Sequence, residues 1–416
     1  MSSSAKPAAS SWKRLVIVLA LGWVVIWISR MMFTPIYPVL SDFFGGVSNT
    51  QLGAISSLYF LGYVVMQIPS GILVDHFGMR QVIVPGFIVF MAGVAVMATA
   101  TTLPVLYVGS IISGAGCGTF YGIAYTITNV FVPKDKKSLA TAIVNSGTAI
   151  GSGVGLVSAS LLVGTHIVSW QALVAFTGFL ALIMALVFAR ALPGRICEID
   201  AEEEELAEGE ETGRVGGLRR LFRPQMVAAY IVYFSALYAY YLISTWLPNF
   251  LETERGFANS FTGIVSSLVF FASIPGALVL SRLADRIPQS KVALIVLLQA
   301  AAAITLFLMV QPFPRPLIVA SIVLYGLLGK LTVEPIIISW LGDFAPKGSV
   351  TTTFGVFNFS GMSASVFAPA VTGSLTDSFG SSVYGYYLAI VIVVVFTASF
   401  LAIGRHGTGA VSTIRR

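Results

Sequence analysis

The chain has 416 residues, of which 56% are hydrophobic and 10% are charged, and its mean hydropathy is +0.88. Soluble globular proteins carry about 25% charged residues, so a chain of this composition could not cover its surface in water. We therefore predict a protein that lies in the lipid bilayer. Its net charge of +6 is explained by cations retained on one side of the membrane, and we expect no nucleic-acid partner.

Apolar stretches long enough to cross a bilayer follow one another along the whole chain. We predict an all-α membrane protein with twelve transmembrane helices, at residues 14–40, 51–73, 81–102, 104–131, 138–163, 168–190, 225–250, 259–281, 291–311, 315–341, 349–374 and 382–404. The first stretch is long, contains Arg30 and precedes no small-residue cleavage site, so we expect a retained helix rather than a signal peptide.

The distribution of lysine and arginine predicts the orientation. If the N-terminus is inside, 20 of the 24 basic residues lie on the inner side, and Arg255 and Arg315 lie on the outer side. The remaining two, Arg30 and Lys330, fall within spans. Because basic residues are retained in the cytoplasm, we predict a multi-pass protein of the inner (cytoplasmic) membrane with both termini cytoplasmic.

A highly charged segment separates two sets of six spans. Residues 191–224 hold nine of the 18 acidic residues, followed by a basic stretch that we expect to lie on anionic lipid. We predict a cytoplasmic tail 1–13, a six-helix half 14–190, a cytoplasmic linker 191–224, a second six-helix half 225–404 and a cytoplasmic tail 405–416. Cys117 falls in a span and Cys197 in the linker, so we expect no disulfide.

Short motifs recur between the two halves at a nearly constant spacing. The pairs are Asp75 with Asp285, Gly114 with Gly326, and Asn145 with Asn358, which are 210, 212 and 213 residues apart. We infer two duplicated, pseudo-symmetric halves. In such proteins a substrate site lies between the halves near the membrane midplane, and rocking of one half against the other exposes it alternately to each side.

The junction of the second and third spans resembles a signature of the major facilitator superfamily. Residues 71–80 read Gly-Ile-Leu-Val-Asp-His-Phe-Gly-Met-Arg, which is similar to the pattern G-x-L-x-D-x-x-G-x-R. The resemblance implies the major facilitator fold, in which spans 1, 4, 7 and 10 line the cavity. It also implies a conformational latch on the inner face, formed by Gly71, Asp75, Gly78, Arg80, Asp285 and Arg286; the alternative is a turn with solvated charges.

Within that superfamily, the first half resembles the anion:cation symporter family of organic-anion transporters. The similarity lies in residues 56–71 of the second span, in Asn145-Ser-Gly147 of the fifth, and in Arg30 of the first. That family commonly has an acid before the arginine and a glutamate in the fourth span, where this chain has Ser29 and Cys117. The resemblance implies a small organic anion as substrate, and these two departures leave the coupling mechanism open.

Three ionisable side chains other than histidine and tyrosine lie well inside predicted spans: Arg30, Lys330 and Glu334. A charge at the bilayer centre costs at least about 2.5–3.5 kcal/mol, so such residues usually face a watery cavity and act there. We predict that Arg30 and Lys330 bind the anion; the alternative for Arg30 is a structural pair or a snorkelling side chain. Glu334 lies one turn after Lys330, so the two could instead pair with each other. Glu334 is also the candidate for proton coupling.

Tyrosine and asparagine side chains complete the candidate substrate site, because hydroxyl and amide groups can orient a polar ligand. The candidates are Tyr121, Tyr125, Tyr238, Tyr241, Asn145 and Asn358, each of which could equally belong to helix packing. The sequence carries no metal-ligand spacing, no Ser/His/Asp set and no phosphate-binding loop, so we expect no enzyme, no cofactor and no ATP-driven pump.

We therefore predict a secondary active transporter that moves a small, carboxylate-type organic anion together with protons and acts as a monomer. Two alternatives remain open. One is a transporter of a neutral or cationic small molecule, such as a sugar or a drug. The other is a non-transporting sensor with the same fold.

Overall fold

Helices account for nearly all of the described chain. The computed structural model describes residues 11–133, 137–192, 222–286, 291–342, 344 and 350–411, and these ranges contain helices and turns but no β-strand. Eleven helical segments among them are long and apolar enough to cross a membrane. A backbone N–H or C=O group without a partner costs several kcal/mol in lipid, and a helix satisfies these groups internally, which explains the predicted all-α architecture.

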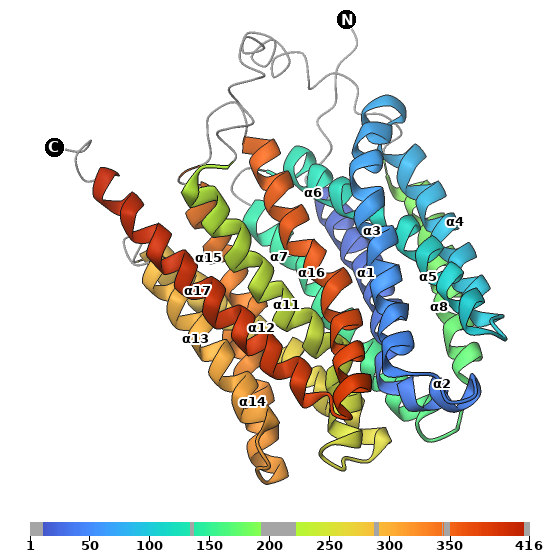
Figure 1. The fold of residues 1–416 in the computed structure, drawn as a ribbon. Coiled ribbons are helices and arrows are strands. Elements are labelled where there is room, and N and C mark those ends of the chain that lie inside the picture. Colours follow the sequence, from blue (N-terminus) through green and yellow to red (C-terminus); the bar gives the residue numbers. More distant parts are fainter. Residues whose placement is uncertain are drawn as a thin grey trace, which may run out of the picture. The chain divides into compact units, whose positions relative to one another are not determined.

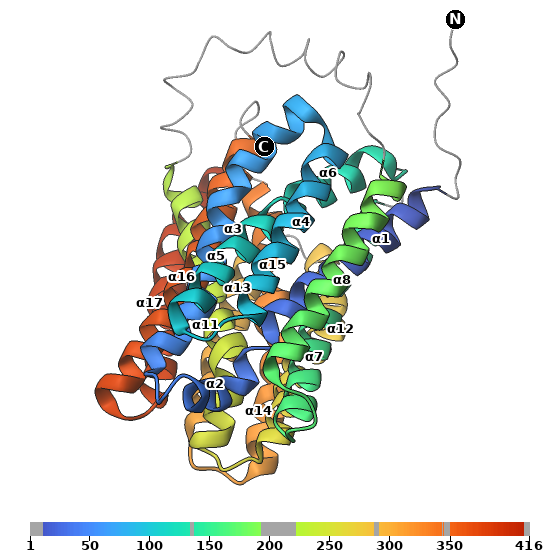
Figure 2. The ribbon, with the colours of Figure 1, turned by 90° about the vertical axis from the view of Figure 1, so that its right-hand side faces the viewer.

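The helices of the first half of the chain pack mainly in pairs. α1 contacts α7, α3 contacts α5, and α4 contacts both α5 and α8 (Figures 1 and 2). The elements are α1 (Ser11–Met31), η1 (Thr34–Ile36), α2 (Tyr37–Phe43), α3 (Asn49–Phe77), α4 (Met79–Ala98), α5 (Leu103–Gly118), α6 (Phe120–Phe131), α7 (Lys137–Ser158), the π-helix η3 (Ala159–Val163) and α8 (Trp170–Ala191). α3 is not among the eleven segments, but its 29 residues cover the second predicted span.

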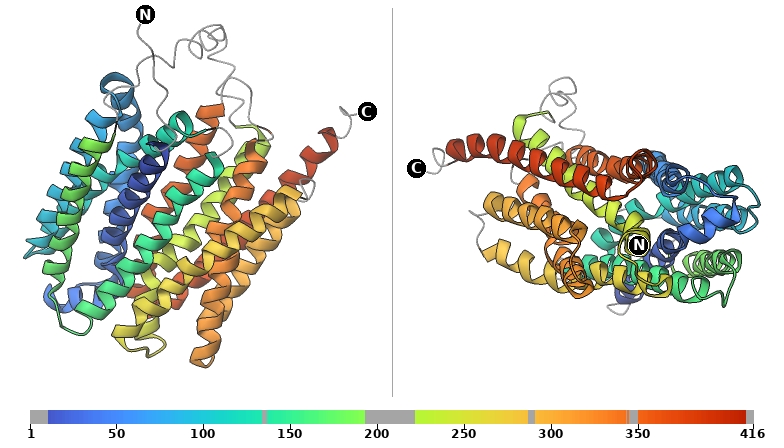
Figure 3. Two further views of the ribbon diagram at one scale, coloured as in Figure 1. Left: turned by 180° about the vertical axis from the view of Figure 1, so that it is seen from behind. Right: turned by 60° about the horizontal axis from the view of Figure 1, so that its bottom comes forward.

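In the second half, α13 contacts α14, α15 and α17, and α16 contacts α17 (Figures 1 and 3). The helices are α11 (Pro224–Thr253), α12 (Asn259–Arg286), α13 (Lys291–Val310), α14 (Arg315–Leu328), α15 (Lys330–Gly342), α16 (Val350–Phe379) and α17 (Val383–Val411). Each predicted span therefore corresponds to one helix or to two or three consecutive helical elements. Most of the predicted linker, with Cys197, lies outside the described residues.

Backbone contacts divide the chain into two compact units. The first unit is Met1–Ile196 with Leu251–Phe270, and the second is Cys197–Phe250 with Phe271–Arg416. The first unit therefore includes the start of α12.

Hydrogen bonds explain why the start of α12 belongs to the first unit. The Asn259 amide donates to Glu252 Oε2 at 2.6 Å and to the Pro35 carbonyl at 3.2 Å. The backbone N–H of Gly263 donates to the Ser160 hydroxyl at 3.1 Å. A Cβ atom on Gly263 would overlap the backbone of α7, so the two helices approach as closely as a glycine allows.

The fourth and tenth predicted spans are each interrupted at a single residue. Thr119 separates α5 from α6, and Gly329 separates α14 from α15. A threonine hydroxyl binds a carbonyl near each break: Thr119 donates to Gly116 at 2.8 Å, and Thr332 donates to Leu327 at 2.8 Å. Such bonds satisfy backbone groups that an interrupted helix leaves in the membrane. The two breaks are 210 residues apart, which matches the spacing of the repeated motifs.

The first predicted span, 14–40, is not one continuous helix. α1 ends at Met31, η1 and α2 follow, and α2 ends at Phe43. Pro35 lies in the first turn of η1 and Pro38 in the first turn of α2. A proline lacks a backbone N–H group and is accepted at the start of a helix rather than inside it, so the chain begins a new helical turn at each proline.

The second span is longer than predicted, and this moves part of the predicted latch into a helix. α3 continues to Phe77, so Gly71 and Asp75 both lie within this helix. Gly71 is exposed, and a Cβ atom there would meet nothing within 4 Å. Gly78 does form the turn: its φ of +87° strongly favours glycine, and it joins α3 directly to α4.

Close packing of α3 on α5 depends on glycine. A Cβ atom at Gly62 would overlap the carbonyl oxygen of Ile111, whereas a Cβ atom at Gly122 of α6 would meet nothing within 4 Å. We expect Gly62→Ala to destabilise the protein by about 1–3 kcal/mol through overpacking. The measurement is the midpoint of thermal unfolding in detergent, with Gly122→Ala as the control. Equal midpoints for the two variants would contradict this account of the packing.

Candidate functional site

Arg30 lies inside the membrane-spanning segment Trp12–Phe43 and is only 6% exposed. Its guanidinium carbon is 4.3 Å from the ring centroid of Tyr63, 4.7 Å from Trp27, 4.9 Å from Phe60 and 5.1 Å from Tyr59. The negative face of an aromatic ring attracts a cation, and the attraction is strongest where water is excluded. The four rings, which we call the aromatic frame, therefore stabilise the charge of Arg30 inside the protein.

Helical periodicity places these rings around Arg30. Trp27 precedes Arg30 by three residues on α1, so the two side chains lie on the same face of that helix. Tyr59 and Tyr63 are four residues apart on α3 and present one face, with Phe60 beside them. These rings were not predicted as site residues, although the aromatic pair Tyr59 and Tyr63, four residues apart in the second span, was a signal that could have revealed them.

A small pocket opens beside Arg30, with room for about one water molecule. Ser29, Ser56 and Ser110 line it, together with apolar and aromatic residues. Ser29 stands where the resemblance expects an acid. Cys117, the other such position, is buried, and its sulfur lies 2.9 Å from the hydroxyl of Tyr59. Neither position supplies a carboxylate, and both adjoin Arg30 or its aromatic frame.

Lys330 and Glu334 form an ion pair. Lys330 begins α15 directly after the break at Gly329, and its Nζ lies 2.8 Å from Glu334 Oε2. The side chains are only 11% and 23% exposed, so the pair is largely buried. Of the two arrangements that the sequence left open, the structure therefore contains the direct pairing of Lys330 with Glu334.

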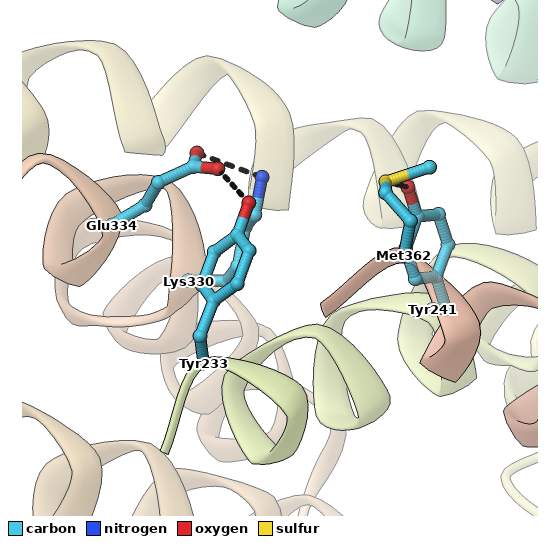
Figure 4. A network of polar contacts seen from close by, with 5 residues as sticks. All are labelled: Tyr233, Tyr241, Lys330, Glu334 and Met362. Carbon is cyan, nitrogen blue, oxygen red and sulfur yellow. Dashed lines mark hydrogen bonds and ion pairs between the residues drawn. The ribbon is translucent and has the colours of Figure 1, made fainter. Parts of the chain in front are cut away.

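Two tyrosines of α11 complete this cluster. The hydroxyl of Tyr233 donates to Glu334 Oε1 (Figure 4). The ring of Tyr240 lies 5.2 Å from Lys330 Nζ. Neither role was predicted, and Tyr238 and Tyr241 were favoured instead. Four tyrosines within nine residues of one helix do not show which of them faces another helix.

Of the remaining predicted substrate residues, Tyr121 is half-buried, and Tyr238 and Tyr241 are buried. Tyr241 donates to the sulfur of Met362 at 3.4 Å, apart from the Lys330–Glu334 pair (Figure 4). Tyr238 is buried, and among the described residues its hydroxyl has no hydrogen-bond partner. Tyr121 lies against Trp23, at 6.3 Å between ring centroids.

The two predicted asparagines differ in exposure. Asn145 of α7 is exposed, and Asn358 of α16 is half-buried. Tyr125 lies on α6, but its side chain is outside the described part of the structure. Arg30, Tyr121, Tyr125 and Asn145 belong to the first unit, and the other predicted substrate residues belong to the second.

The predicted latch is described only in part. Arg80 is exposed in the first turn of α4 and lines an open groove with residues of α4 and α8. Asp75 lies in the last turn of α3, and Asp285 and Arg286 lie in the last turn of α12. The side chains of these last three residues are outside the described part of the structure. The helices, rather than loops, therefore carry the charges of the predicted latch.

Comparison with known proteins identifies the family. A sequence profile of the Major Facilitator Superfamily matches residues 19–369. The chain is 20% identical to the D-galactonate transporter of Escherichia coli O6:H1, over 97% of each chain. It is 22% identical to the hexuronate transporter of Bacillus subtilis, over 90% of each chain.

A solved structure shows the same fold. The crystal structure of a bacterial homolog of the human lysosomal transporter Spinster matches 96% of this chain and 98% of its own with a TM-score of 0.78, at 13% sequence identity. The predicted major facilitator fold is confirmed, and so is the expectation of a multi-pass membrane protein that is a transporter rather than an enzyme. The chain belongs to the major facilitator superfamily.

Proposed function

We propose that this chain is a secondary active transporter of small, carboxylate-type organic anions, coupled to protons. Arg30, buried in its aromatic frame beside a pocket, carries the proposal. The moving bodies would be the six-helix halves 14–190 and 225–404, and alternating access would follow the rocker-switch scheme. We place the protein in the inner membrane with both termini in the cytoplasm, as the distribution of basic residues indicates.

The chemistry of Arg30 favours an anionic substrate. Aromatic rings stabilise a cation but do not cancel its charge, so the frame keeps a positive charge inside the membrane-spanning region. A guanidinium group presents a planar fork of N–H donors that matches the two oxygens of a carboxylate. The D-galactonate and hexuronate transporters are named for sugar acids, each of which carries a carboxylate.

The break at Gly329 supports a second contribution to anion binding. The N-terminus of a helix carries a partial positive charge, and α15 begins at Lys330 inside a membrane-spanning segment. Discontinuous helices in transporters often direct such ends toward an anionic substrate. An anion that approaches Lys330 would compete with Glu334 for the ammonium group, and Glu334 would then take up a proton. Anion binding and protonation would be linked in one step.

The proposal is tested by uptake into liposomes that contain the purified protein. We expect uptake of D-galactonate or D-glucuronate, and a loss of roughly 10- to 100-fold in Arg30→Ala, since a hydrogen bond to a charged group contributes about 1.5–3 kcal/mol. Arg30→Lys should retain part of the activity because it keeps the charge but not the fork. Uptake of a neutral sugar but of no acid would support the alternative substrate class. Binding without uptake would support a sensor.

The coupling role of Glu334 is tested separately. We expect Glu334→Gln to exchange substrate across the membrane at a near-normal rate but to lose accumulation driven by a pH gradient, because its side chain cannot take up a proton. The assay compares counterflow with uptake driven by an inward proton gradient. Asp42→Asn, which changes an exposed acid at the end of α2, is the control and should accumulate substrate normally. Unchanged accumulation in Glu334→Gln would exclude this role.

A further inference from the structure

We infer that Tyr233 is a positioning residue for Glu334: its hydroxyl holds the carboxylate in place and links proton uptake to the opening of the ion pair with Lys330. The inference rests on the proposed coupling role of Glu334 and adds the group that controls it. Tyr233 was not among the residues that the sequence pointed to. It lies on α11, whereas Glu334 lies on α15.

Each carboxylate oxygen of Glu334 contacts a polar side chain, and the two side chains come from different helices. Lys330 pairs with Oε2 from the same helix, and the Tyr233 hydroxyl donates to Oε1 from α11 (Figure 4). A hydroxyl that donates to a carboxylate forms a charge-assisted hydrogen bond, which is stronger than one between neutral groups. Tyr233 therefore stabilises the same charged form of Glu334 that pairs with Lys330.

A third helix fixes the position of the Tyr233 hydroxyl. The ring of Tyr233 stacks on Phe357 of α16, with 4.0 Å between centroids and 13° between planes. Gly361, one turn further along α16, also lies against the ring of Tyr233. A Cβ atom at this position would overlap Cδ1 and Cε1 of the tyrosine. Tyr233 is only 3% exposed. The ring is thus held in a slot that α16 forms, and the hydroxyl is directed at Glu334.

Other titratable side chains of the surrounding helices contact groups other than the Glu334 carboxylate. Tyr240 of α11 faces Lys330, the ring of Tyr325 on α14 lies beside Gly329, and Lys291 of α13 donates to the Ser339 carbonyl at 3.4 Å. Among the described residues, Lys330 and Tyr233 are the ones that contact the Glu334 carboxylate by a hydrogen bond or ion pair. Lys330 also takes part in the proposed anion site, so Tyr233 is the contact that can be altered without changing a charge.

The consequence for transport concerns timing. When an anion draws Lys330 away, the hydroxyl of Tyr233 still holds the carboxylate in place, and it delays protonation until the ion pair has opened. Without the hydroxyl, Glu334 could take up a proton before the anion arrives. Proton uptake and anion binding would then be less tightly linked.

The experiment is an infrared titration of the purified full-length protein, which needs no substrate. The signal is the C=O stretch of a protonated carboxyl group, assigned to Glu334 because Glu334→Gln removes it. We expect Tyr233→Phe to move the midpoint of this signal upward by about one pH unit, since a hydrogen bond to a charged group is lost. Gly361→Ala keeps the hydroxyl but displaces the ring, and should move the midpoint in the same direction.

Tyr230→Phe is the matched control. Tyr230 lies three residues earlier on the same helix and is buried, and among the described residues its hydroxyl has no hydrogen-bond partner. It should keep the wild-type midpoint. A midpoint in Tyr233→Phe equal to that of the wild type would overturn the inference while leaving the coupling role of Glu334 intact. If no titrating carboxyl signal is lost in Glu334→Gln, the coupling role itself fails, and the inference fails with it.

Discussion

A charge in the hydrocarbon core of a membrane must be stabilised by the protein, because no water is there to do so. The described residues meet this constraint in two different ways. Arg30 is surrounded by aromatic rings, which stabilise its charge and leave it positive. Lys330 is paired with Glu334, so that the two charges offset each other. The first arrangement suits the binding of an anion, and the second suits a group that changes its partner during transport.

Helix geometry determines which side chains can meet these requirements. The rings around Arg30 come from α1 and α3, and glycines such as Gly62 allow α3 to pack closely on α5. The interruption at Gly329 starts a new helix inside the membrane-spanning segment and places Lys330 at its first turn. Tyr233 reaches Glu334 because Phe357 and the missing Cβ of Gly361 leave a slot for its ring. At the Lys330–Glu334 pair, glycines thus allow both the helix break before Lys330 and the seat of the Tyr233 ring.

The sequence predicted the fold better than the site. Apolar runs and isolated charges are local properties, so the spans and the three intramembrane charges could be read directly from the chain. The contacts of those charges depend on how each helix is rotated about its axis. In a water-soluble helix the apolar stripe reveals that rotation, but a helix in lipid is apolar on all sides and gives no such signal. For this reason Tyr238 and Tyr241 were favoured over Tyr233 and Tyr240, and the aromatic frame of Arg30 was not foreseen.

In the proposed mechanism, the charge of Arg30 binds the carboxylate of the substrate. The most direct test of this role is the shift in thermal unfolding temperature that D-galactonate, D-glucuronate and other small organic acids cause in the purified protein. We predict that at least one acid raises the unfolding temperature of the wild-type protein by mass action. The same acid should leave the unfolding temperature of Arg30→Ala nearly unchanged. An acid that stabilises Arg30→Ala as strongly as the wild type would contradict this role.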